Sequence, residues 1–546
     1  MHEFAAVLVR ADPATARQVG VLDPQTGRPT LALPATDPAF YARLEETIAG
    51  WAGPVLSPEG SREWLEERCL QAEVAYRLHE LRVARPWQRA PYWYAEVLGD
   101  ALTALDPDHL GDHAYATAYL DLLDEAATFL DAGRASLTPE LVPSRWATMA
   151  IPAVAGLRTL IADELPDLDA ALPTDLAGDA DRRRTALLGA MDAFGQHCDA
   201  LTTAGAGTWA VGEETFTGLL RDYHLLNLSP DEIWEHGWAK VTEVEQGLTE
   251  LAAVLDPART WPEQIEALKA ERTPGPEFVN AYRAEVQTSI GQTLEHDLLS
   301  VPADQECVVA PLPQFRRAGL PLGEMRTVPP YASSMVSQFL ITPADPDATP
   351  ERQAGHERDN CPTFIRSIVG HETYPGHHLQ SVHHVLGTAE DSFLRFFRTP
   401  LFVEGWGLYV EDILEERVFG QSTQALFARR NTLWRSLRLV IDTGLHTGRL
   451  THEDAVQLLV ERTGMDHHRP PGKWTATPAT TTPPTPPRTC WAGTCSTNSA
   501  PPSPPSCPGG RAGCTTRCCG TAPRRCRCWN RCCAASSARR RSRLTW

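Results

Sequence analysis

Several features that mark other protein classes are missing from this sequence. No run of about 18 consecutive apolar residues occurs, so the sequence offers no candidate membrane-spanning helix. Residues 1–20 lack a basic start followed by an apolar core, which argues against a secretory signal peptide. We therefore expect a cytoplasmic protein.

Cysteine is scarce before residue 466. Only four of the 14 cysteines lie there, and they are scattered rather than paired: Cys69, Cys198, Cys307 and Cys361. This distribution indicates reduced thiols rather than a disulfide framework.

The segment 466–546 contains no Val, Ile, Phe, Tyr or Glu and a single Leu, Leu544. Without such residues it buries too little apolar surface to offset its ordering entropy, so we expect disorder. A Cys-rich metal module, a basic nucleic-acid-binding arm and an off-frame translation of a GC-rich gene are the competing interpretations. The irregular cysteine spacing and the abrupt enrichment in Pro, Arg, Cys and Thr favour the off-frame tail.

The formal net charge of -19 is unevenly distributed. Thirteen Arg and Lys against one Asp give residues 466–546 a charge of +12, which leaves -31 for residues 1–465. A body this acidic repels nucleic acid and anionic membrane surfaces. We expect neither as a partner.

The segment 1–300 is predicted to be a largely helical N-terminal region. Apolar residues recur at spacings of three and four in long stretches such as 62–84. Ser229 followed by Pro230, Asp231 and Glu232 is typical of a helix start.

The segment 301–465 is predicted to combine a small β-sheet with active-site helices. Residues 307–313 and 333–344 have an extended character, whereas 363–386, 402–418 and a stretch beginning near Asn431 show helical periodicity. The expected fold is mainly α with a small β-sheet. Such a fold is typical of the helical zincin-like body of the thermolysin or gluzincin superfamily, so we expect a zinc metallopeptidase core here.

The strongest motif is His-Glu-Thr-Tyr-Pro-Gly-His-His at 371–378. Zincins place two histidines four residues apart on one helix face, but position 375 here is proline. In a continuous helix a histidine seven residues after His371 lies about 10 Å along the axis, too far for one ion. A local break at Pro375-Gly376 is therefore required, and it makes His377 or His378 the second ligand.

Catalytic zinc takes three protein ligands and keeps one position open. Glu404, 33 residues after His371, allows a loop and a returning helix and is the candidate third ligand. Glu411 lies seven residues later on the same helix face, where it would orient a ligand histidine. We expect one zinc ion held by His371, His377 and Glu404.

The remaining catalytic groups follow from this arrangement. Glu372 would act as general base for the zinc-bound water and return the proton to the leaving amine. Arg438, Asp442 and His446 share one helix face: His446 would donate to the oxyanion, Arg438 would bind a substrate carboxylate, and Asp442 would support them.

The same three residues also fit an intrahelical salt-bridge ladder on a solvated face. Tyr409 is a candidate substrate contact, although core packing explains it equally well. His383 and His384 more simply cap or flank their helix.

The motifs HETYPGHHLQ, FVEGWGLYVED and RLVIDTGLHTG resemble the bacterial family called domain of unknown function 885. The resemblance extends to about residue 465. It implies a gluzincin-type metallopeptidase in which His371, Glu372, His377 and Glu404 take the roles above. It also implies a Tyr-containing C-terminal segment facing the site, for which 466–546 offers no match.

The sequence thus predicts a zinc-dependent peptidase that hydrolyses short peptides, by carboxypeptidase or dipeptidase action. The alternative is a catalytically inactive metal-binding or peptide-binding protein that lacks its true C-terminal segment.

Overall fold

The computed structural model describes residues 1–273, 275–317, 320 and 322–464. These residues belong to one compact unit, and the domain boundary expected near residue 300 stays a prediction. The described fold is mainly α-helical with a three-stranded sheet, as the sequence predicts. The predicted off-frame tail at 466–546 lies outside the described residues.

Most of the chain before the sheet is helical. The α-helices of this part are α1 (Glu3–Ala11), α2 (Pro13–Val19), α3 (Pro38–Ala49), α4 (Arg62–His79), α5 (Pro86–Arg89), α6 (Pro91–Thr103), α7 (His113–Ser136), α8 (Ser144–Thr159), α9 (Ala177–Ala204), α10 (Glu213–Asp222), α11 (Pro230–Leu255), α12 (Trp261–Lys269) and α13 (Phe278–Glu295). Short 3₁₀ or π turns connect or extend them: η1 (Glu80–Ala84), η2 (Pro107–His109), η3 (Leu160–Glu164), η4 (Leu165–Ala171) and η5 (Gly275–Glu277).

The rest of the described chain forms the sheet and the helices that follow it. These elements are β1 (Gln305–Pro311), η6 (Gln314–Arg316), β2 (Gly323–Arg326), β3 (Met335–Ile341), α14 (Pro350–Asp359), α15 (Pro362–Glu372), α16 (His377–Gly387), α17 (Phe393–Phe396), α18 (Pro400–Leu414), η7 (Glu415–Phe419), α19 (Thr423–His446) and α20 (His452–Thr463).

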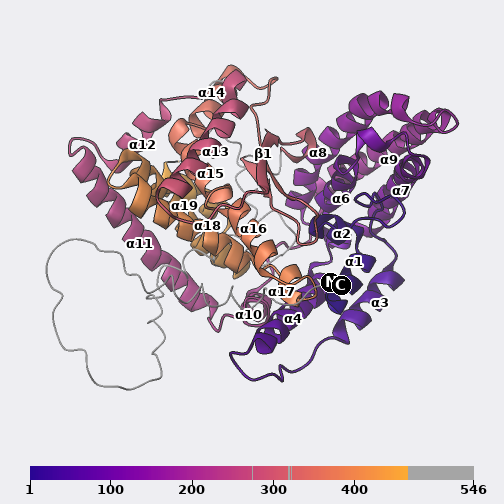
Figure 1. The fold of residues 1–546 in the computed structure, drawn as a ribbon, viewed down its shortest axis with the longest axis horizontal. Coiled ribbons are helices and arrows are strands. Elements are labelled where there is room, and N and C mark those ends of the chain that lie inside the picture. The colour runs from indigo at the N-terminus through magenta and orange to yellow at the C-terminus, as the bar shows by residue number, and fades with distance from the viewer. Residues whose placement is uncertain (274, 318–319, 321, 465–546) are drawn as a thin grey trace, which may run out of the picture. The chain divides into compact units, whose positions relative to one another are not determined.

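Two groups of helices carry the largest buried clusters. The helices α6 to α9 pack together around Tyr94, Tyr119 and Phe194, and they lie together in Figure 1. The helices α11, α15, α19 and α20 share a second apolar cluster that includes Leu248 and Leu437. The sheet packs on α13 and α15 through a third buried apolar cluster. The core of the second group therefore supports α15, which carries His371, and α19, which carries Arg438, Asp442 and His446.

The sheet has the order β1-β3-β2. Strand β1 runs parallel to β3 with Val309 opposite Phe339, and β2 runs antiparallel with Met325 opposite the same residue. The sequence predicts β1 and β3 but not β2, because β2 spans only Gly323–Arg326 and shows no alternation of apolar residues.

Phe315 joins the sheet region to the N-terminal helices. Its side chain is 2% exposed and belongs to the cluster of α6 to α9. A Cβ at Gly99 would come within 2.1 Å of its ring, and a Cβ at Gly156 within 2.6 Å of its Cα. Glycine at these two helical positions therefore makes room for Phe315.

Two helix starts show how local sequence sets the boundaries. At Ser229 a reciprocal capping box opens α11, and this start is confirmed as predicted. The last long helix begins at Thr423, not near Asn431 as expected. The side chain of Ser422 accepts a hydrogen bond from the Ala425 N–H and caps the helix eight residues earlier.

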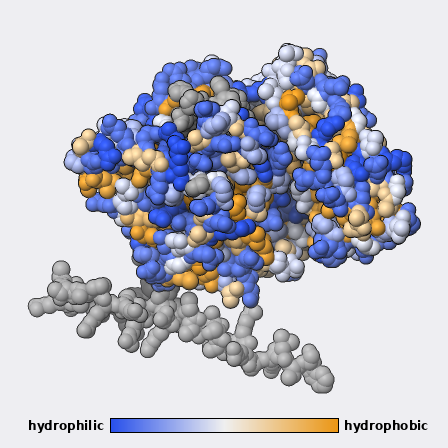
Figure 2. All heavy atoms as spheres, turned by 90° about the horizontal axis from the view of Figure 1, so that it is seen from above, coloured by the Kyte–Doolittle hydropathy of each residue, from blue (hydrophilic) through white to orange (hydrophobic). Residues whose placement is uncertain are grey.

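The surface residues and the cysteines of the described chain have the character expected from the composition. Hydrophilic side chains cover most of the face seen in Figure 2. Among the described residues no helix is both long and apolar enough to cross a membrane. The four cysteines before residue 466 are free, as expected.

We predict that Phe315→Ala lowers the free energy of unfolding by about 3–5 kcal/mol, because it empties a closely packed site between α6 and α8. Chemical denaturation followed by circular dichroism measures the change. The matched control is Phe402→Ala, which removes a ring that is 59% exposed and should change stability by less than about 0.5 kcal/mol. Equal effects of the two substitutions would contradict the packing role of Phe315.

Candidate metal centre

The helix that carries His371 ends one residue later. Helix α15 stops at Glu372, Thr373 leaves the helical region at φ -114° and ψ -84°, and α16 starts at His377. A Cβ at Gly376 would lie 1.8 Å from the His371 carbonyl oxygen, so this turn requires glycine. The indole N–H of Trp406 donates to the Pro375 carbonyl at 3.0 Å. The predicted break is therefore a complete interruption between two helices.

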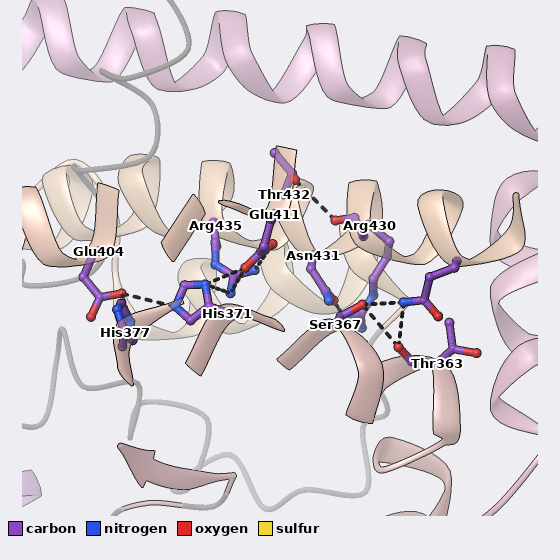
Figure 3. A network of polar contacts seen from close by, with 12 residues as sticks. Thr363, Ser367, His371, His377, Glu404, Glu411, Arg430, Asn431, Thr432 and Arg435 are labelled. Atoms are coloured by element: carbon purple, nitrogen blue, oxygen red, sulfur yellow. Dashed lines mark hydrogen bonds and ion pairs between the residues drawn. The ribbon is translucent and has the colours of Figure 1, made fainter. Parts of the chain in front are cut away.

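The interruption turns the His377 ring back toward His371. The two ring centroids are 4.6 Å apart and nearly perpendicular. Glu404, on α18, approaches both rings: its Oε2 lies 3.7 Å from His371 Nε2 and 3.9 Å from His377 Nε2. One potential ligand atom from each residue lies within 4.8 Å of the others. The three predicted ligands thus meet at one place (Figure 3).

The alternative ligand, His378, points to the sheet. Its Nδ1 accepts from the Ser337 hydroxyl at 2.8 Å, and its Nε2 donates to Gln305 Oε1. Gln305 Oε1 also accepts from the Tyr374 hydroxyl at 2.5 Å. Both ring nitrogens of His378 are engaged by protein groups, so the structure brings His377 and not His378 to the cluster.

Glu411 holds the far side of the His371 ring. Its Oε1 lies 2.6 Å from His371 Nδ1, which is the position expected from the spacing on α18. Arg435, on α19, contacts both oxygens of Glu411 at 2.8 and 3.2 Å. With Nδ1 bound to Glu411, the Nε2 atom of His371 faces Glu404 and His377 (Figure 3).

Gly407 allows the ring of His371 to lie against α18. A Cβ at position 407 would come within 2.4 Å of the ring Cε1 and 2.8 Å of both nitrogens. No side chain other than hydrogen fits between the helix backbone and this imidazole.

Burial and charge set the protonation of the cluster. Burial lowers the pKa of His371, but the carboxylates of Glu404 and Glu411 outweigh it and raise the pKa to about 9. Burial raises the pKa of Glu372 to about 7, although the charge of His371 opposes it. Burial lowers the pKa of His377 to about 4, so this imidazole is neutral at pH 7 and available as a ligand.

Helices α18 and α19 run in opposite directions past the cluster. Glu415 pairs with Arg429, Glu411 with Arg435, and Leu401 packs in the cluster of Leu439. The two helices are therefore antiparallel. Because Glu411 pairs with Arg435, the residues of α19 that follow Arg435 lie at the level of Glu404 on α18.

Arg438 is the first predicted site residue on this part of α19. Burial raises the pKa of Glu404, but His371 and His377 and, to a smaller extent, the charge of Arg438 outweigh it and lower the pKa. The Arg438 guanidinium also lies 5.7 Å from the ring centroid of Trp434. The structure thus brings Arg438 into the electrostatic range of the cluster.

Asp442 and His446 continue the same face but are buried, so this face is not a solvated salt-bridge ladder. Asp442 is 1% exposed, and within the described part of the chain neither carboxylate oxygen has a hydrogen-bond partner. His446 Nε2 lies 3.8 Å from Asp442 Oδ1, and His446 Nδ1 accepts from the Val211 N–H at 3.3 Å. Burial raises the pKa of Asp442 to about 8, with Arg438 opposing it, and lowers that of His446 to about 4.

Tyr409 has a different position. It is 49% exposed, its ring lies 5.8 Å from that of Trp406, and five residues of helix separate it from Glu404. At about 100° per residue this offset turns it away from the side of the ligands. Its role in substrate binding stays a prediction. His383 and His384 bind backbone carbonyls of Ser300 and Arg395, outside the cluster.

Sequence reasoning missed Arg435 and Gly407. Arg435 precedes Arg438 by three residues, but no spacing rule links it to Glu411 on another helix. Gly407 stands in Glu-Gly-Trp-Gly, and a glycine in the middle of an apolar helix was the available signal for a close approach.

We predict that Gly407→Ala weakens zinc binding about 10-fold or more, because the new methyl group displaces the His371 ring. Chelator competition on the purified protein measures the affinity. Gly387→Ala is the control, since a Cβ there meets nothing within 4 Å. Unchanged affinity in Gly407→Ala would show that the ring position does not govern metal binding.

The buried Asp442 carboxyl predicts a pH-dependent stability. Its pKa is about 8 in the folded protein and about 4 in an unfolded chain, so the folded state retains the proton between these values. The contribution of this group to stability is complete below about pH 4 and is lost as the pH rises toward 8. The substitution Asp442→Asn removes this loss of stability at higher pH, because the amide does not ionise. Melting temperatures of the metal-free proteins should therefore shift in favour of the variant between pH 5 and 8, and a constant difference would refute this.

Comparison with known proteins places the chain in a family. No curated protein matches it. A candidate lipoprotein of unknown function from Shewanella oneidensis has the same fold, with a TM-score of 0.65, 16% identity and 90% of each chain covered. A candidate lipoprotein from Colwellia psychrerythraea matches with a TM-score of 0.64 and 17% identity over 90% of this chain and 89% of that chain.

At these identities the two structures show the fold alone. The model of a bacterial family of unknown function matches residues 13–476 of the sequence, which confirms the resemblance of the three motifs. The chain therefore belongs to the bacterial family DUF885, whose members are described as proteins of unknown function.

Proposed function

We propose that this protein is a zinc-dependent peptidase of the gluzincin type that hydrolyses short peptides. The observation that carries the proposal is the meeting of His371, His377 and Glu404 within 4.8 Å, with Glu372 next to the first ligand in the chain. Two imidazoles and one carboxylate are the donor set of many catalytic zinc sites, and three ligands leave a position for the substrate.

The chemistry of these residues fits a metal ion. The separations of 3.7 and 3.9 Å between Glu404 and the two imidazoles exceed hydrogen-bond length, and the three groups direct their polar atoms at one place that a metal ion would suit. The Nδ1 atom of His371 is already bound to Glu411, which leaves Nε2 to coordinate.

Zinc at this place would polarise the scissile carbonyl and favour ionisation of the attacking water. Glu372 would accept the proton from that water and return it to the leaving amine. His446 would donate from Nε2 to the oxyanion or to the peptide, since its Nδ1 accepts from the Val211 N–H, and Asp442 lies on the Nε2 side of the ring. Arg438, whose charge acts on Glu404, would bind a substrate carboxylate, and this role favours carboxypeptidase or dipeptidase action.

The second candidate is a metal-binding or peptide-binding protein without turnover. It is favoured by the composition of 466–546, which offers no tyrosine for the C-terminal segment that the family resemblance implies. The cytoplasmic location also stays a prediction from the sequence.

We predict that Glu372→Gln retains one zinc per chain and loses about 10²- to 10⁴-fold in peptide hydrolysis, because the amide cannot accept the proton. Mass spectrometry of a peptide library and metal analysis of the same preparation measure both. His371→Ala is the companion variant and should lose the zinc. Zinc binding without hydrolysis in the unsubstituted chain would select the second candidate, and absence of zinc would exclude both.

A further inference from the structure

The side of His371 that faces away from Glu404 is occupied by a cation. Arg435 is 9% exposed, and its guanidinium contacts both oxygens of Glu411 while one of its nitrogens lies 3.4 Å from His371 Nδ1. We propose that Arg435 is a positioning residue, which acts through Glu411 to fix the ring of His371 for metal binding. This inference rests on the proposed metal site.

Three helices meet in this contact. His371 comes from α15, Glu411 from α18 and Arg435 from α19, and Figure 3 shows Glu411 and Arg435 together beside the His371 ring. A carboxylate that accepts only from an imidazole can rotate about its last torsion. The two-pronged contact with Arg435 removes that freedom, because a guanidinium matches both carboxylate oxygens at once.

Burial makes the pair mutually dependent. Glu411 is 6% exposed, and an isolated carboxylate or guanidinium at such depth is strongly unfavourable. Each therefore needs the other in place. Arg435 compensates the charge of Glu411 and keeps it directed at Nδ1, so that the proton of the ring stays on Nδ1 and Nε2 points to Glu404 and His377.

The same helix pair contains an internal comparison. Arg429 lies six residues before Arg435 on α19 and binds Glu415, which follows α18, at 2.6 Å. This pair has the same chemistry, but its contacts are with Glu415 and the Gly247 carbonyl instead of a ligand histidine. Arg429 thus serves as a control for the loss of an α19 arginine that pairs with a glutamate of the preceding helical segment, at a more exposed position (37% against 11% of the side chain).

The test is a thermodynamic cycle in zinc affinity, measured by chelator competition on the full chain. We expect Arg435→Gln to weaken zinc binding about 10- to 100-fold, the range found when partners of ligand histidines are removed. In a Glu411→Gln background the same substitution should change affinity by no more than about 2-fold, because the proposed path through Glu411 to His371 is already broken. Arg435→Lys keeps the positive charge but cannot contact both carboxylate oxygens of Glu411 at once, so it should cause an intermediate loss of zinc affinity.

Two results would overturn the inference while zinc binding itself persists. One is a full and additive loss from Arg435→Gln in the Glu411→Gln background. The other is an equal loss in Arg429→Gln, which would indicate a general effect on α19. Melting temperatures of the metal-free variants separate reduced stability from reduced affinity. An unsubstituted chain that binds no zinc overturns the proposed function and this inference together.

Discussion

The arrangement of the site depends on the close contact between the His371 ring and the backbone of α18 at Gly407. This contact sets the distance between α15 and α18, and with it the reach of Glu404 to one ring nitrogen and of Glu411 to the other. A single imidazole is thereby held between two carboxylates from the same helix. Their separation of seven residues places both on the face that meets the ring.

The second constraint is the interruption between α15 and α16. A continuous helix keeps residues six or seven positions apart on different turns, and no rotamer of histidine bridges that gap. The interruption exchanges several helical hydrogen bonds for contacts from other segments, including the indole of Trp406. Pro375 and Gly376 suit such a turn because neither favours a helix interior.

The sequence was most informative where one segment contained both the ligand and its constraint. The break at Pro375-Gly376, the helix with Glu404 and Glu411, and the start of α11 at Ser229 all follow from local spacing. The choice between His377 and His378 did not, because it depends on Ser337 and Gln305 of the sheet. Arg435 was not predicted for the same reason: its partner belongs to another helix, and pairing between helices leaves no periodic signal in the sequence.

Phe315 connects the N-terminal helices to the sheet beside the site through its packing between α6 and α8. Its ring is enclosed between α6 and α8, and Arg316, the next residue, pairs with Glu324 of β2 at 3.3 Å. Strand β2 is hydrogen-bonded to β3, and β3 carries Ser337, which holds His378 beside His377. A shift of α6 and α8 would therefore reach the sheet, against which α15, the helix that carries His371, also packs. Strain imposed on the N-terminal helices would thus act through one sheet on both histidines of the cluster.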